Sequence, residues 1–196
     1  MESADTQYIE NLLPSIKEIT APDIRQKVAQ AWLNLWHEGS YRRIEDCSWF
    51  EAMRGEITWS NHEHSEQVAK VAIAAAQAVR EAQGIEVNMD YVIAGALLHD
   101  VDKLVTFDGR THELTNKGAG LPHGFFGAKA ALDVGLPVEI AHICLAHTSD
   151  SPTKPRTVEA VIVHFADFIT GNVRMLVEGR PFSYGSLMSS YVAGAH

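Results

Sequence analysis

The chain has 196 residues, of which 46% are hydrophobic and 21% are charged; such a composition is typical of a globular protein with a sizeable core. Its formal net charge of −9 at pH 7 argues against nucleic acid or a membrane surface as a partner. A phosphorylated substrate stays open, because a bound metal ion can reverse the local field. The two cysteines, Cys47 and Cys144, are too few for a disulfide framework and favour a reduced compartment.

The first residues, MESADTQ, are acidic and lack a signal-peptide pattern. We expect no apolar run as long as a membrane helix. The sequence therefore predicts a cytoplasmic protein with no membrane partner.

Helical periodicity dominates the N-terminal third of the chain. Residues 7–36 have apolar positions at helical spacing, interrupted near residues 20–23, and predict two helices. Residues 37–60 carry Trp49, Phe50 and Trp59 without a clear period. We expect residues 1–59 to form an N-terminal helical extension and connector.

Two helices with clear end signals follow. The first begins at Ser60, where the pair Ser60 and Glu63 has the spacing of a capping box, and it ends before Gly84. The second is predicted from about Asn88 to near His99.

Proline, glycine and polar residues divide the rest of the chain into helices and loops. Loops are predicted at residues 105–121 and 148–156. Helices are predicted over residues 122–135, over 137–147, and from Thr157 to Ile169 with Gly171 as the stop. No segment has a convincing strand pattern, so the predicted fold class is all-α.

Several predicted helices carry histidine or aspartate on their apolar face. Asp100 follows Ile93, Ala96 and Leu97 at helical spacing, which directs its carboxylate inward beside His99. The same reasoning directs inward His64, His147 and Asp167, and His123 lies at a predicted helix start. A buried charge must be paired or must coordinate a metal, and imidazole with carboxylate suits zinc, iron or manganese. A single buried histidine is ordinarily a hydrogen-bonded core residue, but four histidines and two aspartates in series favour a metal site.

This series resembles a known enzyme family. His64, His99–Asp100, His123, His147 and Asp167 lie in the strings EHSEQVAKVA, ALLHDVDKL, LPHGFFGAKAA, IAHICLAHT and HFADFI. The pattern resembles the two-metal branch of the HD-domain superfamily of metal-dependent phosphohydrolases. Within that branch it is similar to the bacterial symmetrical diadenosine-tetraphosphate hydrolases. The resemblance implies an HD-domain helical bundle over residues 60–180, followed by a C-terminal tail over 181–196.

The resemblance also implies a role for each matching residue. Two divalent ions, which can be iron, manganese, zinc, nickel or cobalt, would activate a water molecule for attack on phosphorus. The first ion would be held by His64, His99, Asp100 and Asp167. Asp100 would bridge to the second ion, which His123 and His147 would complete. Asp100 and Lys103 are therefore the candidate catalytic residues, with Lys103 meeting the phosphate.

Smaller assignments accompany these roles. His164 shares a helix face with Asp167, so orientation of that carboxylate and an ordinary core position are both open for His164. The tryptophans, including Trp49, are expected to be core or interface anchors. Asp102 stands where the family often has glycine, and the sequence assigns it no role.

Three functions from different classes stay open at this stage. The leading hypothesis is hydrolysis of a small phosphorylated substrate, such as a nucleotide, by a dinuclear metal site. The alternative is a mixed-valent di-iron oxygenase that cleaves a C–P or C–C bond. The third is a degenerate HD module that binds without catalysis, which the presence of all six ligand positions disfavours. Self-association into a homo-oligomer is also left open.

Overall fold

The computed structural model describes residues 4–51, 54–55, 58–148 and 151–180. Within these ranges the regular elements are α-helices and two short 3₁₀ helices, with isolated β-bridges and no strand, so the all-α prediction is confirmed. The tail over 181–196 lies outside the described residues. In chain order the elements are α1 (Ala4–Leu12), η1 (Pro14–Glu18), α2 (Pro22–Glu38), η2 (Ile44–Asp46), α3 (Asn61–Gln83), α4 (Met89–Leu98), α5 (Lys103–Thr106), α6 (Asn116–Gly120), α7 (Phe125–Asp133), α8 (Val138–Ala146) and α9 (Val158–Val177).

Helix α3 begins and ends where its sequence signals place it. The Ser60 hydroxyl accepts a hydrogen bond from the Glu63 backbone N–H, and the Glu63 carboxylate accepts one from the Ser60 N–H at 3.0 Å. This reciprocal pair satisfies two donors that a helix start would otherwise leave unpaired. Gly84 ends the helix with φ 67°, a left-handed conformation that favours glycine.

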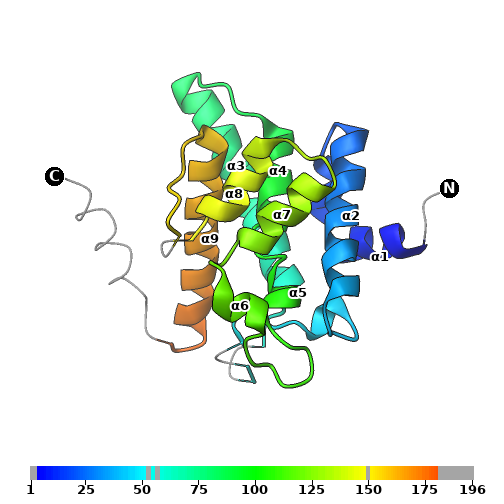
Figure 1. Ribbon diagram of the computed structural model, residues 1–196. Helices are drawn as coiled ribbons and strands as arrows, with labels where there is room; N and C mark the ends of the chain where they lie inside the picture. Colours follow the sequence, from blue (N-terminus) through cyan, green and yellow to red (C-terminus); the bar gives the residue numbers. More distant parts are fainter. Residues whose placement is uncertain (1–3, 52–53, 56–57, 149–150, 181–196) are drawn as a thin grey trace.

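Helix α4 forms the centre of the bundle. It packs against α2, α3, α8 and α9 (Figure 1). Its residues 92–98 are all buried. Close approach of α8 depends on Gly95, because a Cβ at that position would lie 2.5 Å from Cδ1 of Ile143. A helix buried on all sides positions its C-terminal end, and the residues just beyond it, without contact with bulk water.

The N-terminal extension shares a core with the bundle. Trp32 of α2 is fully buried and donates a hydrogen bond from its indole N–H to the Leu97 carbonyl oxygen at 2.9 Å. The Glu66 carboxylate on α3 accepts from both the backbone N–H and the hydroxyl of Ser15. These contacts join residues 4–51 to the bundle, and the division at residues 59 and 60 stays a prediction.

The structure corrects three of the predicted boundaries. The predicted loop over 105–121 contains the last residues of α5 and all of α6. Helix α7 begins at Phe125, after a turn, rather than at Pro122. Helix α9 continues past Gly171 to Val177, so Gly171 is not a stop. Its missing side chain makes room for an aromatic ring, because a Cβ there would lie 2.9 Å from the Trp49 indole.

Helix α9 is long and apolar enough, by length and composition alone, to cross a membrane. The expectation that no run reaches this length is therefore wrong. Core helices of globular proteins pass the same test, and α9 packs against α3, α4 and α8 with His164 buried. One side of α9 packs into the bundle, and the other side exposes Val161, Phe165, Ile169, Val173, Leu176 and Val177.

Gly95, which lies in α4 where α8 packs against it, allows a test of the packing between these helices. Replacing glycine by alanine inside a helix ordinarily stabilises it by about 1 kcal/mol. For Gly95→Ala we expect instead a loss of about 1–3 kcal/mol of unfolding free energy, because the added methyl overlaps Ile143. Urea denaturation measures this. In an Ile143→Ala background, which removes the overlapping side chain, the added cost of Gly95→Ala should be smaller. A Gly95→Ala protein as stable as the wild type would contradict the packing described.

Candidate metal centre

The six residues that the sequence singles out meet at one place in the bundle. They lie in helices or directly beside helix ends. His64 lies in the first turn of α3, and His99 and Asp100 directly follow α4. His123 precedes α7, His147 follows α8 and Asp167 lies within α9. Their ligand atoms form three overlapping groups in which all atoms lie within 4.8 Å of one another: His64, His99 and Asp100; His99, His147 and Asp167; and Asp100, His123 and His147.

One side of this centre is built around His64. Its Nε2 lies 3.0 Å from Oδ1 of Asp167 and 3.1 Å from Nε2 of His99. Both imidazole Nε2 atoms are 3.5 Å from Oδ2 of Asp100. Four potential ligand atoms therefore point at one small volume.

The other side is built around His123. Its Nε2 lies 2.8 Å from Oδ1 of Asp100 and 3.2 Å from Nε2 of His147. The His147 Nε2 is 3.5 Å from the same carboxylate oxygen. The two oxygens of Asp100 thus face two different sets of imidazoles.

Helix ends orient two of these rings. Nδ1 of His99 donates to the Ala96 carbonyl oxygen at 2.6 Å, and Nδ1 of His147 donates to the Cys144 carbonyl oxygen at 2.7 Å. The last carbonyls of a helix have no partner within the helix, so they are free to accept these bonds. Such a bond fixes the tautomer and turns Nε2 toward the centre, as metal-ligating histidines require.

Without metal, the buried charges compensate one another. Burial alone would raise the pKa of Asp167, but hydrogen bonds from His64 and His99 hold that pKa well below its usual range. Burial opposes the charged form of His99, yet the neighbouring Asp100 carboxylate raises its pKa to about 10. His123 likewise overcomes burial, through Asp102 and Asp100, and its pKa rises to about 10. The metal-free centre therefore holds protons on two of its imidazoles at neutral pH.

Lys103 stands at the edge of the centre, as the first residue of α5. Its ammonium group donates to Oδ2 of Asp100 at 2.6 Å and to the Trp49 carbonyl oxygen at 2.7 Å. It is mostly buried, so its charge acts in a medium of low polarity. A cation in this position can meet an anion that enters beside Asp100.

Sequence reasoning left Asp102 without a role, but it contacts the centre. Its side chain is fully buried; Oδ2 accepts from the Gly124 backbone N–H at 2.7 Å, and Oδ1 lies 3.2 Å from Nδ1 of His123. The available signal was the carboxylate itself, two residues beyond Asp100 on a buried turn.

His164 does not contact Asp167 through its Nδ1. That atom donates a hydrogen bond to the His147 carbonyl oxygen at 2.6 Å, so His164 holds the backbone of His147.

A cavity of about 270 Å³ opens beside the centre and reaches both Lys103 and His123. Most of its remaining lining is apolar and aromatic: Trp49, Phe50, Phe107, Leu114 and Leu121. The Trp49 ring also lies against the His64 ring, with centroids 4.8 Å apart. Trp49 is therefore part of the site wall, which the expectation of a core or interface anchor missed.

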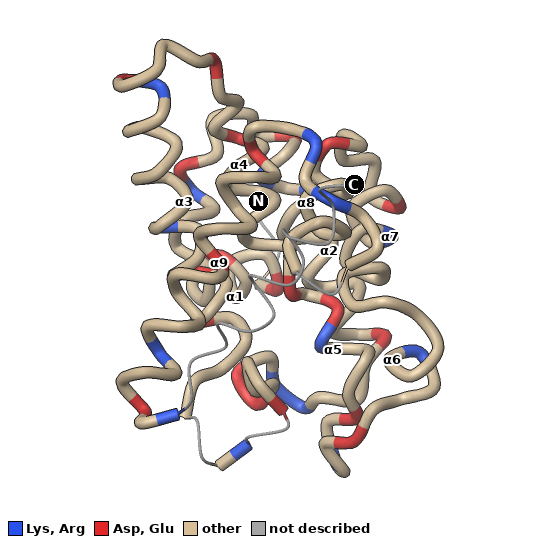
Figure 2. The backbone as a smooth tube through the Cα atoms, turned by 90° about the vertical axis from the view of Figure 1, so that its left-hand side faces the viewer, with Lys and Arg blue, Asp and Glu red and all other residues tan. Residues whose placement is uncertain are grey.

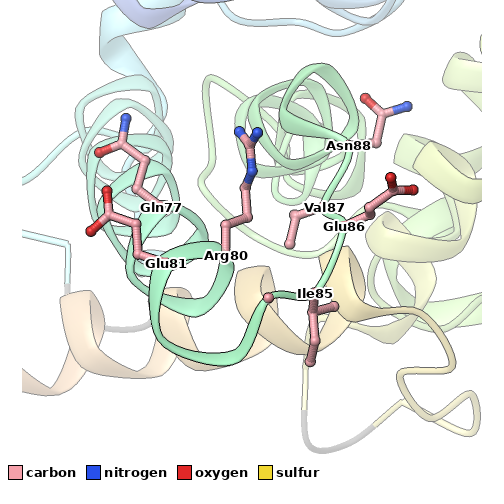
Figure 3. Close-up of a pocket in the computed structure, with 8 residues that line it drawn as sticks. Gln77, Arg80, Glu81, Ile85, Glu86, Val87 and Asn88 are labelled. Carbon is pink, nitrogen blue, oxygen red and sulfur yellow. The ribbon is translucent and has the colours of Figure 1, made fainter.

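A larger cavity of about 840 Å³ lies elsewhere (Figure 3). It is formed by the last turns of α3 and the segment before α4, with Arg80 and Glu86 among its lining residues. Along α3 it lies about 20 Å from His64, at 1.5 Å of rise per residue. It therefore contains none of the six clustered residues.

Comparison with known proteins assigns this architecture to a family. The HD domain matches residues 61–171. Dihydroneopterin 2',3'-cyclic phosphate phosphodiesterase of Methanocaldococcus jannaschii is 32% identical over 173 residues, which cover 81% of this chain and 67% of that protein. Ribonuclease Y of Acidothermus cellulolyticus is 32% identical over 108 residues, covering 55% of this chain and 18% of the enzyme. Ribonuclease Y of Geobacter metallireducens is 27% identical over 185 residues, which cover 94% of this chain and 31% of that enzyme.

The chain thus spans two thirds of the archaeal relative and less than a third of these ribonucleases. No solved structure matches the chain. None of these three relatives is a diadenosine-tetraphosphate hydrolase, so that narrower resemblance stays a prediction. The matched segment contains all six clustered residues and Lys103. The chain belongs to the HD-domain family of metal-dependent phosphohydrolases.

Proposed function

We propose that this protein hydrolyses a small compound that carries a single phosphate, as a phosphodiester or a phosphate ester, at a centre of two divalent metal ions. The observation that carries this proposal is the position of Asp100. Its two carboxylate oxygens face two separate sets of histidines. The Lys103 ammonium group donates to one of these oxygens, Oδ2, at 2.6 Å.

The donor set fits two ions. His64, His99 and Asp167 would hold one ion, and His123 and His147 the other, with Asp100 shared between them. Imidazole and carboxylate without thiolate suit iron, manganese, zinc, nickel or cobalt. Such a pair supplies an activated water molecule and a positive field for the phosphoryl oxygens.

Lys103 supplies a positive charge that can interact with the phosphate of the substrate. Its ammonium group lies within hydrogen-bond distance of Asp100, so a phosphate that approaches the centre comes within reach of the same group. Charge-assisted hydrogen bonds of this kind strengthen as negative charge develops on the phosphoryl oxygens. We therefore assign Lys103 to the stabilisation of the transition state.

The lining of the adjoining cavity limits the charge and the shape of the part of the substrate that lies beyond the phosphate. Lys103 is the one lysine or arginine in its described lining. The carboxylate of Glu51 is occupied by Tyr41, Ser48 and Arg54, so it offers the cavity little free charge. A polyphosphate chain would need more cations than this, whereas one phosphate attached to a planar apolar group fits.

The substrates that match this description share an aromatic ring system. The archaeal relative is named for a cyclic phosphate of a pterin, which has one phosphate and a planar ring. Aromatic side chains such as Trp49 and Phe50 favour offset or edge-on contact with such a ring. Nucleoside 2',3'-cyclic phosphates have the same chemistry and belong to the proposed class.

Both kinds of relative are named for phosphodiesterase or ribonuclease activity, which does not favour the oxygenase alternative. The net charge of −9 and the small cavity favour a small molecule over a nucleic acid. Lysine and arginine positions are spread along the backbone over many elements (Figure 2). The cytoplasmic location and the oligomeric state stay predictions.

A substrate panel tests the proposal. With Mn²⁺ or Zn²⁺ present, we expect release of product from pterin and nucleoside cyclic phosphates and from aryl phosphodiesters. Diadenosine tetraphosphate should be a poor substrate, because the cavity holds a single lysine. Chromatography of the products with a phosphate assay measures both. Turnover of the polyphosphate alone would contradict the assigned substrate class.

The matched variant for this panel is Lys103→Met, which removes the ammonium group and keeps an unbranched side chain that is one atom shorter. We expect kcat to fall by about 10²-fold or more, as for the loss of one transition-state donor. The metal content should be unchanged, since Lys103 is not a proposed ligand. A variant with wild-type kcat would remove Lys103 from the mechanism.

Metal binding should release protons. In the metal-free centre the pKa values of His99 and His123 are raised to about 10, so both imidazoles are protonated at neutral pH. A metal ion binds the neutral ring, so these protons must leave and the affinity must rise with pH. Calorimetric titration with Zn²⁺ from about pH 6 to about pH 8, in buffers of different ionisation enthalpy, measures this release. An affinity independent of pH across this range would contradict it.

A further inference from the structure

We propose that Asp102 is a positioning residue that holds His123 in the tautomer and orientation needed to bind a metal ion through Nε2. The inference rests on the ligand set proposed above, in which His123 belongs to the second ion. It assigns a function to a fully buried carboxylate that is itself in none of the three ligand groups.

One oxygen of Asp102 fixes the backbone beside His123. Oδ2 accepts from the Gly124 N–H at 2.7 Å. Gly124 has φ 86°, and a Cβ there would lie 2.1 Å from the Cys144 carbonyl oxygen. The turn that carries His123 is therefore pressed against the end of α8 and tied to Asp102 at the same time.

The other oxygen faces the His123 ring. Oδ1 lies 3.2 Å from Nδ1 of His123 and makes no hydrogen bond to any group in the described part of the chain. A buried carboxylate oxygen without a hydrogen bond is costly, so this oxygen has a strong preference for an N–H donor. The Nδ1–H of His123, 3.2 Å away, is a donor that a small rotation of either side chain would bring into a hydrogen bond with it.

The position of His123 explains why it needs a side chain from elsewhere. His99 and His147 each follow a helix and donate from Nδ1 to a free carbonyl three residues earlier. His123 precedes its helix, α7, so the helix offers it no such carbonyl. Asp102, at the start of α5, supplies the missing acceptor.

The direction of the ring agrees with this assignment. With Nδ1 turned to Asp102, Nε2 lies 2.8 Å from Oδ1 of Asp100, inside the centre. A proton held on Nδ1 leaves the Nε2 lone pair available, and a carboxylate acceptor increases the basicity of the ring. Asp102 thus acts on the second ion through His123 without touching it.

The test is the variant Asp102→Asn, titrated with Zn²⁺ against a chromophoric chelator. The amide has one acceptor oxygen for the two donors that the carboxylate serves, so either Gly124 or His123 loses its bond. We expect the dissociation constant of the second Zn²⁺ to rise by about 10- to 100-fold and that of the first to stay within a factor of about two. Asp108→Asn is the matched control, because Asp108 also accepts backbone N–H bonds at a turn but faces no histidine of the centre.

A second measurement uses the wild-type protein and does not depend on how the variant folds. In ¹⁵N spectra of the Zn²⁺-loaded protein we expect His123 to carry its proton on Nδ1. Zn²⁺ bound through Nδ1, or an Asp102→Asn protein that binds both ions with wild-type affinity, would overturn the inference. Both ions bound without turnover of any phosphate compound would overturn the proposed function and leave this inference standing.

Discussion

The burial of the Asp100 carboxylate is the constraint on which the rest of the structure depends. An ionised carboxylate removed from water is strongly unfavourable unless it is surrounded by positive charge or hydrogen-bond donors. The chain meets this need with Lys103 and with imidazoles from several helices, and these lower the pKa of Asp100 well below its usual value in spite of burial. In the function proposed here, the Asp100 carboxylate and the same imidazoles bind metal ions once the imidazoles have released their protons. Stability and function therefore share one cluster of side chains.

Most residues of this cluster are positioned by the ends of helices. Free carbonyls at the ends of α4 and α8 accept hydrogen bonds from His99 and His147, and the Asp102 carboxylate faces Nδ1 of His123, where we propose that it has the equivalent role. Gly124 and Gly95 allow the close approaches that bring these ends together. Most residues of the centre lie in the turns at the ends of packed helices, so the packing of the core sets their positions.

Local patterns in the sequence predicted the helices around the centre and its inward-facing residues. The capping box at Ser60 and the helical spacing that leads to Asp100 are short-range signals, and both describe the structure well. The errors arose where distant segments meet. Gly171 reads as a stop because nothing nearby in sequence shows that Trp49 fills the space above it. Asp102 and the wall formed by Trp49 were missed for the same reason, since their partners lie on other elements.

The central claim is that Asp100 joins two metal ions, and anomalous diffraction from crystals grown with Mn²⁺ tests it most directly. The account predicts two anomalous peaks, one on each side of the Asp100 carboxylate, with His64, His99 and Asp167 at one peak and His123 and His147 at the other. A single peak, or two peaks that do not share Asp100, would contradict it.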